Sequence, residues 1–226
     1  MGLLTLSGSY TKTFSDDEVF YFVSPFRVDI YSKTQYYPVA TISGNLGFTD
    51  GWAEDAFIFL GTSGGLYSVE KPSSWGVSED LSYKLVYEKN ISEALSSESI
   101  TCIAGIDVNM FVVGTVSGVD VVENKSNVYS SLSVSPVEAA CLTEELDLYY
   151  GGGFGLAIKN APISSSWGSP DFLLEYPFLP HTEVNDIESV TVSGDTLVGV
   201  ATTSGMILIQ ARDPVFLSPT IKLFVG

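Results

Sequence analysis

One pattern occurs four times in this chain and constrains its fold more than any other feature. An apolar run is followed by a small residue, three turn residues, a glycine and a second apolar run. The copies read FIFL-GTSG-GLYSV at 57–69, MFVV-GTVS-GVDVV at 110–122, DLYY-GGGF-GLAIK at 147–159 and LVGV-ATTS-GMILI at 197–209. The runs are rich in β-branched and aromatic residues, so each copy predicts a β-hairpin.

The glycines of the pattern have a conformational reason. A tight hairpin needs a positive φ, which glycine adopts without a clash of a Cβ atom. A weaker fifth copy, VFYF-VSPF-RVDIY at 19–31, has Arg27 where the others have glycine. The turn there must differ, and Pro25 indicates a turn built around proline.

Further strand-like runs flank each hairpin. Upstream runs open at Ile100, Val137 and Ile187, and downstream runs include YPVATIS, YKLVYE, VYSSLSV, FLLEYPF and PVFLSPT. Each repeat therefore predicts about four strands. The terminal runs at 3–8 and 221–226 are expected to complete a closed ring of units by pairing into the first or last one. The only helix predicted is a turn or two around Ser92–Ser97.

The spacing of the repeats alternates. The closing position of the hairpin falls at Arg27, Gly65, Gly118, Gly155 and Gly205, so successive intervals are 38, 53, 37 and 50 residues. The tetrapeptide SSWG occurs around both Trp75 and Trp167, and the two copies are separated by about the combined length of one long and one short interval. This rhythm indicates a pair of units duplicated in tandem, in the order A-B-A-B-A.

Four antiparallel strands in about 40–50 residues, repeated along the chain, are typical of a β-propeller blade. The sequence predicts one all-β domain over 1–226, a five-bladed β-propeller of four-stranded antiparallel blades with alternating long and short repeats. GTSGGLYSVE at 61–70 and GTVSGVDVVE at 114–123 resemble the hairpins of sensor-regulator propeller repeats. That resemblance implies the fold and carries over no functional residue. A β-sandwich or double-sheet roll is the alternative, although it requires no such rhythm.

Charge and composition exclude several partners. The 226 residues include 27 acidic and 10 basic ones, a net charge of −17. Such a field repels phosphate backbones and anionic membranes, so neither nucleic-acid binding nor membrane docking is expected. No apolar run approaches the roughly 18 residues of a membrane span. Cys102 and Cys141 lie in apolar runs and are expected to be buried free thiols.

No catalytic or cofactor motif stands out. His181 is the only histidine and lies in a proline-rich loop, where a solvated side chain is expected. Zinc, calcium and phosphate-loop patterns are missing, so neither a metal nor another cofactor is predicted. The acidic residues recur in equivalent stretches such as DGWAED, IDVN, TEELD and SGDT. That repetition favours turn capping over catalysis.

The candidate binding residues lie in irregular segments and at the repeated tryptophans. The long segments 88–99 and 176–186 both precede the first strand of a repeat, so they are expected on one face of the disc. The second segment contributes Phe178, Leu179, His181 and Glu183. Trp75 and Trp167 favour packing against a neighbouring blade, and the other interpretation is stacking on sugars.

These observations favour a non-catalytic interaction module that binds a protein partner or a larger assembly. An accessory subunit of a virion or a surface layer, in an extracytoplasmic setting, is the expected context. A glycan-binding lectin with repeated pockets is the alternative, and a carbohydrate-active hydrolase with central carboxylates comes third.

Overall fold

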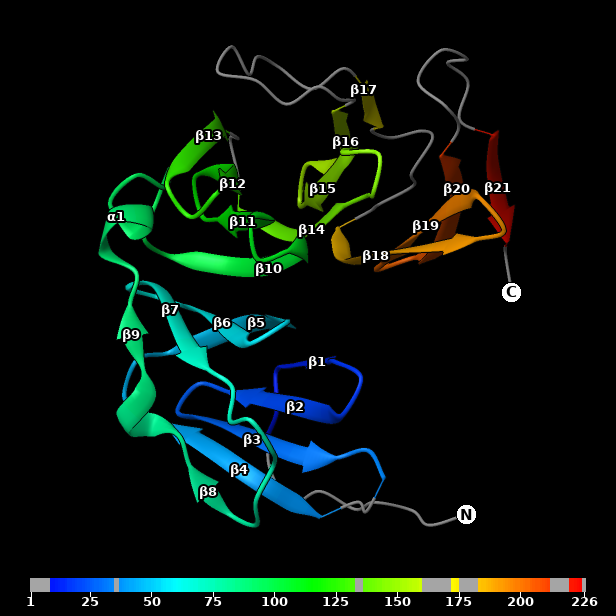
Figure 1. The fold of residues 1–226 in the computed structure, drawn as a ribbon. Coiled ribbons are helices and arrows are strands. Elements are labelled where there is room, and N and C mark those ends of the chain that lie inside the picture. The colour runs from blue at the N-terminus through cyan, green and yellow to red at the C-terminus, as the bar shows by residue number, and fades with distance from the viewer. Residues whose placement is uncertain are drawn as a thin grey trace.

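The computed structural model describes residues 9–34, 37–132, 136–159, 172–174, 183–211 and 220–224. The strands of these residues form five sheets, here numbered I to V in chain order, that follow one another around a common centre (Figure 1). Two short helices, α1 (Lys89–Ser92) and a 3-10 turn at Ser82–Lys84, are the helical elements described. No described helix is long and apolar enough to cross a membrane.

Each sheet consists mainly of consecutive antiparallel strands. Sheet I contains β1 (Lys12–Ser15), β2 (Val19–Ser24), β3 (Arg27–Ser32), β4 (Pro38–Ser43) and β8 (Glu79–Asp80). Sheet II contains β5 (Phe48–Glu54), β6 (Phe57–Thr62), β7 (Gly65–Glu70) and β9 (Val86–Tyr87). Sheet III contains β10 (Ile100–Asp107), β11 (Met110–Thr115), β12 (Gly118–Glu123) and β13 (Asn127–Leu132). Sheet IV contains β14 (Val137–Leu142), β15 (Leu148–Gly152), β16 (Gly155–Lys159) and β17 (Phe172–Leu174), and sheet V contains β18 (Val184–Val192), β19 (Asp195–Thr202), β20 (Gly205–Ala211) and β21 (Thr220–Phe224).

The predicted hairpins are the second and third strands of the sheets. Thr62 pairs with Gly65 across the β6–β7 turn, and Thr202 pairs with Gly205 in the same way. Gly65, Gly155 and Gly205 have φ values of +120°, +99° and +141°, as a tight reversal requires. Arg27 is not among the described residues with a positive φ, so its Pro25–Phe26 turn differs as expected. Gly118 is not among them either, so the positive φ predicted for that glycine is wrong.

A small residue is required before each turn for a different reason from the one predicted. A Cβ atom on Gly61 would lie 2.5 Å from Cγ2 of Ile100, and one on Gly151 would lie 2.7 Å from Cβ of Val184. Ile100 and Val184 belong to the first strand of the next sheet. These glycines are therefore needed because a neighbouring sheet approaches closely, and the reversal itself depends on the glycine four residues later.

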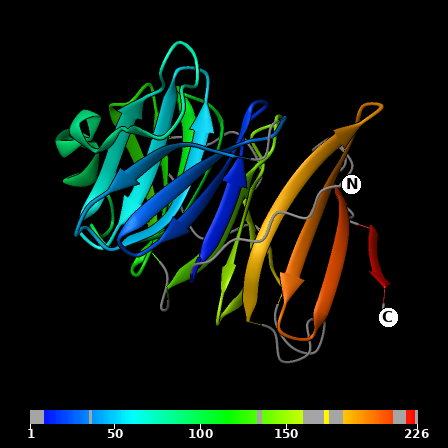
Figure 2. The same ribbon diagram turned by 90° about the horizontal axis from the view of Figure 1, so that it is seen from below.

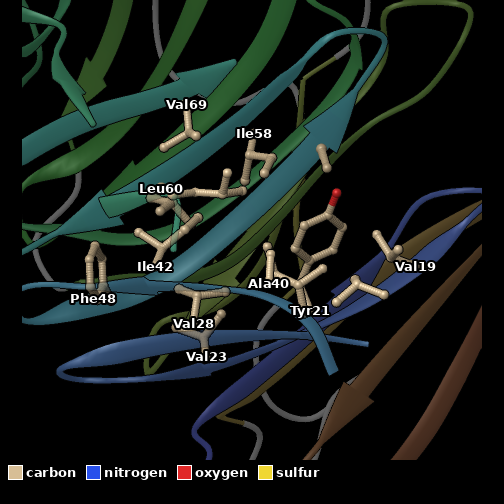
Figure 3. Close-up of a cluster of buried hydrophobic side chains, with 14 residues drawn as sticks. Val19, Tyr21, Val23, Val28, Ala40, Ile42, Phe48, Ile58, Leu60 and Val69 are labelled. Atoms are coloured by element: carbon tan, nitrogen blue, oxygen red, sulfur yellow. The ribbon is translucent and has the colours of Figure 1, made fainter. Parts of the chain in front are cut away.

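Apolar side chains fill the seam between each pair of successive sheets. The I–II seam contains Tyr21, Val28 and Ile42 from sheet I against Phe48 and Leu60 from sheet II (Figure 3). Equivalent apolar clusters join sheet II to sheet III, sheet III to sheet IV and sheet IV to sheet V. Complete burial of one such side chain contributes about 1.5–3 kcal/mol, so the four seams supply most of the driving force for folding.

The segment between β7 and β9 differs from the prediction of purely antiparallel blades. It crosses back to sheet I, where β8 pairs in parallel with β4 and Leu81 enters the I–II core. The chain then returns to sheet II as β9. The SSWG stretch lies on this crossing, and Trp75 packs edge-on against Tyr21 with ring centroids 6.5 Å apart. This segment therefore ties sheet I to sheet II.

The segment 88–99 was expected to form an exposed recognition loop, and its apolar side chains contradict that expectation. Helix α1 begins at Lys89, earlier than the predicted Ser92, and buries Ile91. Leu95 lies with Ile91 in the II–III core. The insertion is apolar enough to fill the outer part of that seam, which is why it folds inward.

The ring formed by the described sheets is open on one side. Figures 1 and 2 show sheet V and sheet I at the two ends of an arc. The described apolar clusters join I–II, II–III, III–IV and IV–V, and none of these clusters joins V to I. Strand β21 pairs with β20, which confirms that the C-terminal run pairs into an end unit. The expected closure of the ring is not seen between the described sheets, and the run at 3–8 lies outside the described residues.

Candidate functional site

The first strands of all five sheets surround a central cavity of about 1200 Å³. Strands β1, β5, β10, β14 and β18 supply most of its lining, and Phe20 and Phe22 of β2 border it on the open side. A cavity at the meeting point of five strands is the natural place to look for chemistry in this fold.

One residue in each first strand occupies the same register position. Each pairs with the small or apolar residue that precedes a hairpin turn: Lys12 with Val23, Asp50 with Gly61, Cys102 with Gly114, Ala139 with Gly151 and Asp186 with Ala201. In sheets II to V a bulge comes directly before this residue. These five residues are called here the central ring. They occupy equivalent positions in the strand register, but their residue types differ from sheet to sheet.

Asp50 is the most buried carboxylate of the central ring. Its Oδ1 accepts a hydrogen bond from the backbone N–H of Gly51 at 2.8 Å, and its Oδ2 accepts one from the N–H of Ile103 at 3.1 Å. Burial raises the pKa of Asp50 to about 6, and the nearby Lys12 charge and these two hydrogen bonds limit the rise. The carboxylate thus joins the first strands of sheets II and III.

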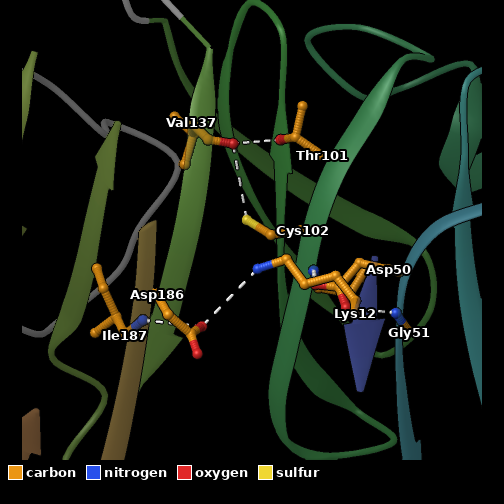
Figure 4. Close-up of polar contacts among 9 residues, drawn as sticks. Lys12, Asp50, Gly51, Thr101, Cys102, Val137, Asp186 and Ile187 are labelled. Atoms are coloured by element: carbon orange, nitrogen blue, oxygen red, sulfur yellow. Dashed lines mark hydrogen bonds and ion pairs between the residues drawn. The ribbon is translucent and has the colours of Figure 1, made fainter. Parts of the chain in front are cut away.

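Lys12 and Asp186 connect the two ends of the arc. The Nζ atom of Lys12 lies 4.0 Å from Oδ1 of Asp186, and the two side chains are 29% and 60% exposed. Figure 4 shows the Lys12 side chain extending toward Asp186. An ion pair this exposed contributes at most about 1 kcal/mol.

The two cysteines are buried and free, as predicted. Burial raises the pKa of Cys102 to about 12 and that of Cys141 to about 11, so both thiols stay protonated near neutral pH. The Cys102 thiol also lies 3.8 Å from the carbonyl oxygen of Val137, to which it donates (Figure 4). Neither sulfur is suited to act as a nucleophile.

Most residues singled out from the sequence fall outside the described part of the chain. Trp167, Phe178, Leu179 and His181 belong to this group. Glu183 is exposed immediately before β18 and lies beside Glu138, whose pKa is raised by burial and by the Glu183 charge.

Trp75 lies in a different part of the molecule from Glu183. It is half-buried and borders a second hollow of about 840 Å³ between the β1–β2 turn of sheet I and the β5–β6 turn of sheet II. The hollow is also lined by Asp16, Glu54 and Lys71. The structure therefore does not bring Trp75 and Glu183 into one site.

The turn acids behave as predicted where they lie in turns. Asp16 accepts hydrogen bonds from the N–H groups of Glu18 and Val19 at 2.9 Å, and Asp107 accepts one from Asn109 at 2.7 Å. The turn assignment is wrong for Asp50, which lies within β5. The sequence did not mark the central ring, because the distance from each ring residue to its hairpin changes with the length of the intervening turn.

The comparisons with known proteins agree with this architecture. The sequence matches no family profile and no curated protein. The WD40 β-propeller domain of Doa1 superimposes with a TM-score of 0.66 at 13% identity, over 94% of this chain and 67% of that one. The fold is a β-propeller. The Malassezia sympodialis allergen Mala s 1 (TM-score 0.63, 13% identity) matches 94% of this chain and 78% of its own.

A third propeller neighbour is extracellular. The extracellular domain of the hybrid two-component system BT3049 from B. thetaiotaomicron matches 92% of this chain at 18% identity, over 29% of its own length and with a TM-score of 0.63. This neighbour fits the resemblance to sensor-regulator propeller repeats. At these identities the likeness shows the fold alone.

The central ring offers little catalytic chemistry in the described residues. Asp50 is held by two backbone donors and Asp186 faces Lys12, so these carboxylates already have partners. Among the residues that the structure describes, no group of three or more histidine, cysteine or acidic side chains could hold a metal ion. The arrangement is that of a polar lining that joins neighbouring sheets.

The raised pKa of Asp50 predicts a specific pH dependence of stability. The folded protein holds this proton up to about pH 6, whereas the unfolded chain releases it near pH 3.8. Its stabilising contribution is therefore complete below about pH 3.8 and is lost as the pH rises through 6. Relative to Asp50→Asn, the wild type should lose about 2 kcal/mol of unfolding free energy between pH 4 and pH 7.

Urea unfolding of both proteins at each pH measures this difference. Asp107→Asn is the control, because that side chain is exposed, and its curve should run parallel to the wild type. Parallel curves for Asp50→Asn and the wild type would contradict the assignment.

Proposed function

We propose that this chain is a non-catalytic protein-interaction module in which each of the five sheets is one propeller blade. The 53-residue interval from Gly65 to Gly118 contains the long β7–β9 crossing and the segment 88–99. Propellers commonly present rigid surfaces to other proteins, and the two ends of the arc are the surfaces that support this proposal.

The observation that carries the proposal is that both end sheets expose one apolar face. On sheet I this face, called end face I, includes Phe20, Phe22 and Tyr31, and Phe20 is 37% exposed. On sheet V the corresponding surface, called end face V, includes Val190 and Met206, which are 55% and 56% exposed.

Strand register determines which residues share these faces. Phe20 pairs with Tyr31, and Val190 pairs with Leu197, so each pair points to the same side of its sheet. The opposite sides carry the buried residues of the I–II and IV–V seams. Large apolar side chains exposed on one side of an end sheet are the feature from which we infer an interaction surface.

Binding assays with single charged substitutions test the proposal. Phe20→Glu and Met206→Glu place a carboxylate in each end face, so binding of proteins captured from the source organism should fall at least tenfold. Tyr83→Glu is the matched control, because Tyr83 is 76% exposed and lies outside both end faces. Partners retained equally by all variants would contradict the proposal.

A glycan-binding role at Trp75 is a second candidate. It is supported by the half-buried indole beside Asp16, Glu54 and Lys71 in the second hollow, since sugars bind to aromatic rings flanked by polar groups. A glycan array probed with the wild type and Trp75→Ala tests it. Binding that Trp75→Ala abolishes supports this role, and an array without any hit excludes it for the glycans tested.

A further inference from the structure

We propose that the partner of end face V is end face I of a second copy of this chain, in head-to-tail association. This inference rests on the proposed function, because it assumes that the end faces bind protein. It adds the identity of the partner and the polarity of the contact.

The first argument comes from the seams within one chain. In three of them a residue of the next sheet covers the small residue before the hairpin turn: Ile100 covers Gly61, Val137 covers Gly114 and Val184 covers Gly151. The covering residue always stands two positions before the central-ring residue of its own strand.

Applied to the end sheets, the same rule leaves one position uncovered. Ala201 is the equivalent small residue of sheet V, and it is exposed. The equivalent covering residue of sheet I is Tyr10, two positions before Lys12. End face V and end face I are therefore the two halves of a fifth seam.

The second argument is charge. End face V carries Glu188, which pairs with Gly199 on the exposed side of the sheet. End face I carries Lys33, whose Nζ lies 5.0 Å from the centre of the Phe20 ring. Only 10 basic residues occur in this acidic chain, so a lysine on this face sets it apart. Opposite charges at the rims of two apolar faces favour their association.

Arg27 and Asp29 on end face I neutralise each other. Their side chains form an ion pair at 2.7 Å, and Tyr10 donates a second hydrogen bond to Asp29 at 2.7 Å. Asp29 is 4% exposed, so this acid presents little charge to a partner. Lys33 remains as the basic group beside the aromatic side chains, because Lys12 already pairs with Asp186.

Closure within one chain is disfavoured by the packing of the inner seams. To bring sheet I against sheet V, the angles at all four seams would have to change together. Their residues include Tyr21, Phe59, Val112 and Val198, which are 0% exposed. Close-packed interiors resist such changes. Packing a second molecule against end face V therefore costs less free energy than closing the arc within one chain.

Mixing two variants tests the polarity of the contact. Phe20→Glu blocks end face I and leaves end face V intact, and Met206→Glu does the reverse. In light scattering at increasing concentration, the wild type should rise above the mass of one 24.3 kDa chain. Each variant alone should remain a monomer, and an equal mixture should form a 1:1 dimer, because each variant retains the face that the other needs.

Controls separate association from misfolding. Circular dichroism and thermal unfolding should show both variants folded, with midpoints within a few degrees of the wild type. Tyr83→Glu should associate as the wild type does. A wild type that stays monomeric up to about 1 mM, or variants that still associate alone, or a mixture that forms no dimer, would overturn the proposal.

These results also separate this inference from the proposed function. If the wild type stays monomeric and a different protein binds in a manner that Met206→Glu abolishes, the interaction module stands and the second copy is excluded. If neither self-association nor any binding responds to the two substitutions, both proposals fail.

Discussion

Replacing Gly151 by valine is expected to lower the free energy of unfolding by about 3 kcal/mol. The backbone accepts valine here, since Gly151 is not among the described glycines with positive φ. The added Cβ, however, would lie 2.7 Å from Cβ of Val184 and 2.8 Å from the carbonyl oxygen of Gly155. Val184 is β-branched and fully buried, so it has little room to move.

Ala201→Val is the matched control for Gly151→Val. It makes a similar change at the same register position of sheet V, where the side chain is exposed. Its effect on the stability of the monomer should stay within about 0.5 kcal/mol. Urea unfolding at low protein concentration measures both. An equally large loss for Ala201→Val would mean that another part of the chain covers this position and that the arc closes on itself.

Removing the Asp16 carboxylate is expected to destabilise the protein by about 3 kcal/mol. Asp16 Oδ2 lies 2.8 Å from Lys71 Nζ, and the two side chains are 14% and 13% exposed. Oδ2 also accepts a hydrogen bond from the hydroxyl of Tyr21 at 2.7 Å. In Asp16→Ala, the Lys71 charge and the Tyr21 hydroxyl both lose their partner inside the I–II seam, which is why the expected loss is large.

The pH dependence of this loss is also predicted. Burial alone would raise the pKa of Asp16, yet the hydrogen bonds from Lys71, Tyr21 and the β1–β2 turn lower it. The carboxylate therefore stabilises the fold above the unfolded pKa of about 3.8, and this contribution disappears as the pH falls through the lower folded value. The difference between wild type and Asp16→Ala should shrink in acid.

Asp17→Ala is the control for Asp16→Ala. The neighbouring side chain is exposed, so its removal should change stability by less than about 0.5 kcal/mol. Comparable losses for the two variants would show that the buried ion pair does not hold sheet I to sheet II.

The hairpins were predictable because they depend on local chemistry. Apolar strands and glycines at fixed offsets determine the β6–β7 and β19–β20 pairings within about thirteen residues of sequence. The same reasoning expected the C-terminal run to pair into the first or last unit, where it joins the last sheet, and placed the two cysteines in the interior. Each of these features follows from residues close together in the chain.

The central ring could not be predicted in the same way. Lys12, Asp50 and Asp186 meet because three first strands converge at the centre, and these residues are up to 174 positions apart. The interval from the ring residue to its paired residue before the hairpin turn is 11 residues for Lys12 and for Asp50 but 15 for Asp186, so no single spacing marks all three. The bulge that precedes Asp50 and Asp186 also leaves no clear signal in the sequence.

The open side of the ring was not predicted either. The repeat pattern counts hairpins, and the number of hairpins does not determine the angle between neighbouring sheets. That angle depends on the volume of the side chains in each seam, such as Phe59 and Phe111 between sheets II and III. The parallel strand β8 was not predicted for a related reason. Its position depends on which unpaired sheet edge lies within reach of the long connection between β7 and β9.

Hydroxyl-radical footprinting in dilute and concentrated solution tests the central claim most directly, namely that both end faces are free in the monomer and bind protein. Met206 and Phe20 should react readily in dilute solution, while the buried Phe59 and Phe111 stay protected. Both end-face residues should become protected as copies associate or a partner is added. If Met206 were as protected as Phe111 even in the most dilute monomer, the arc would be closed on itself and the proposed interaction surfaces would not exist.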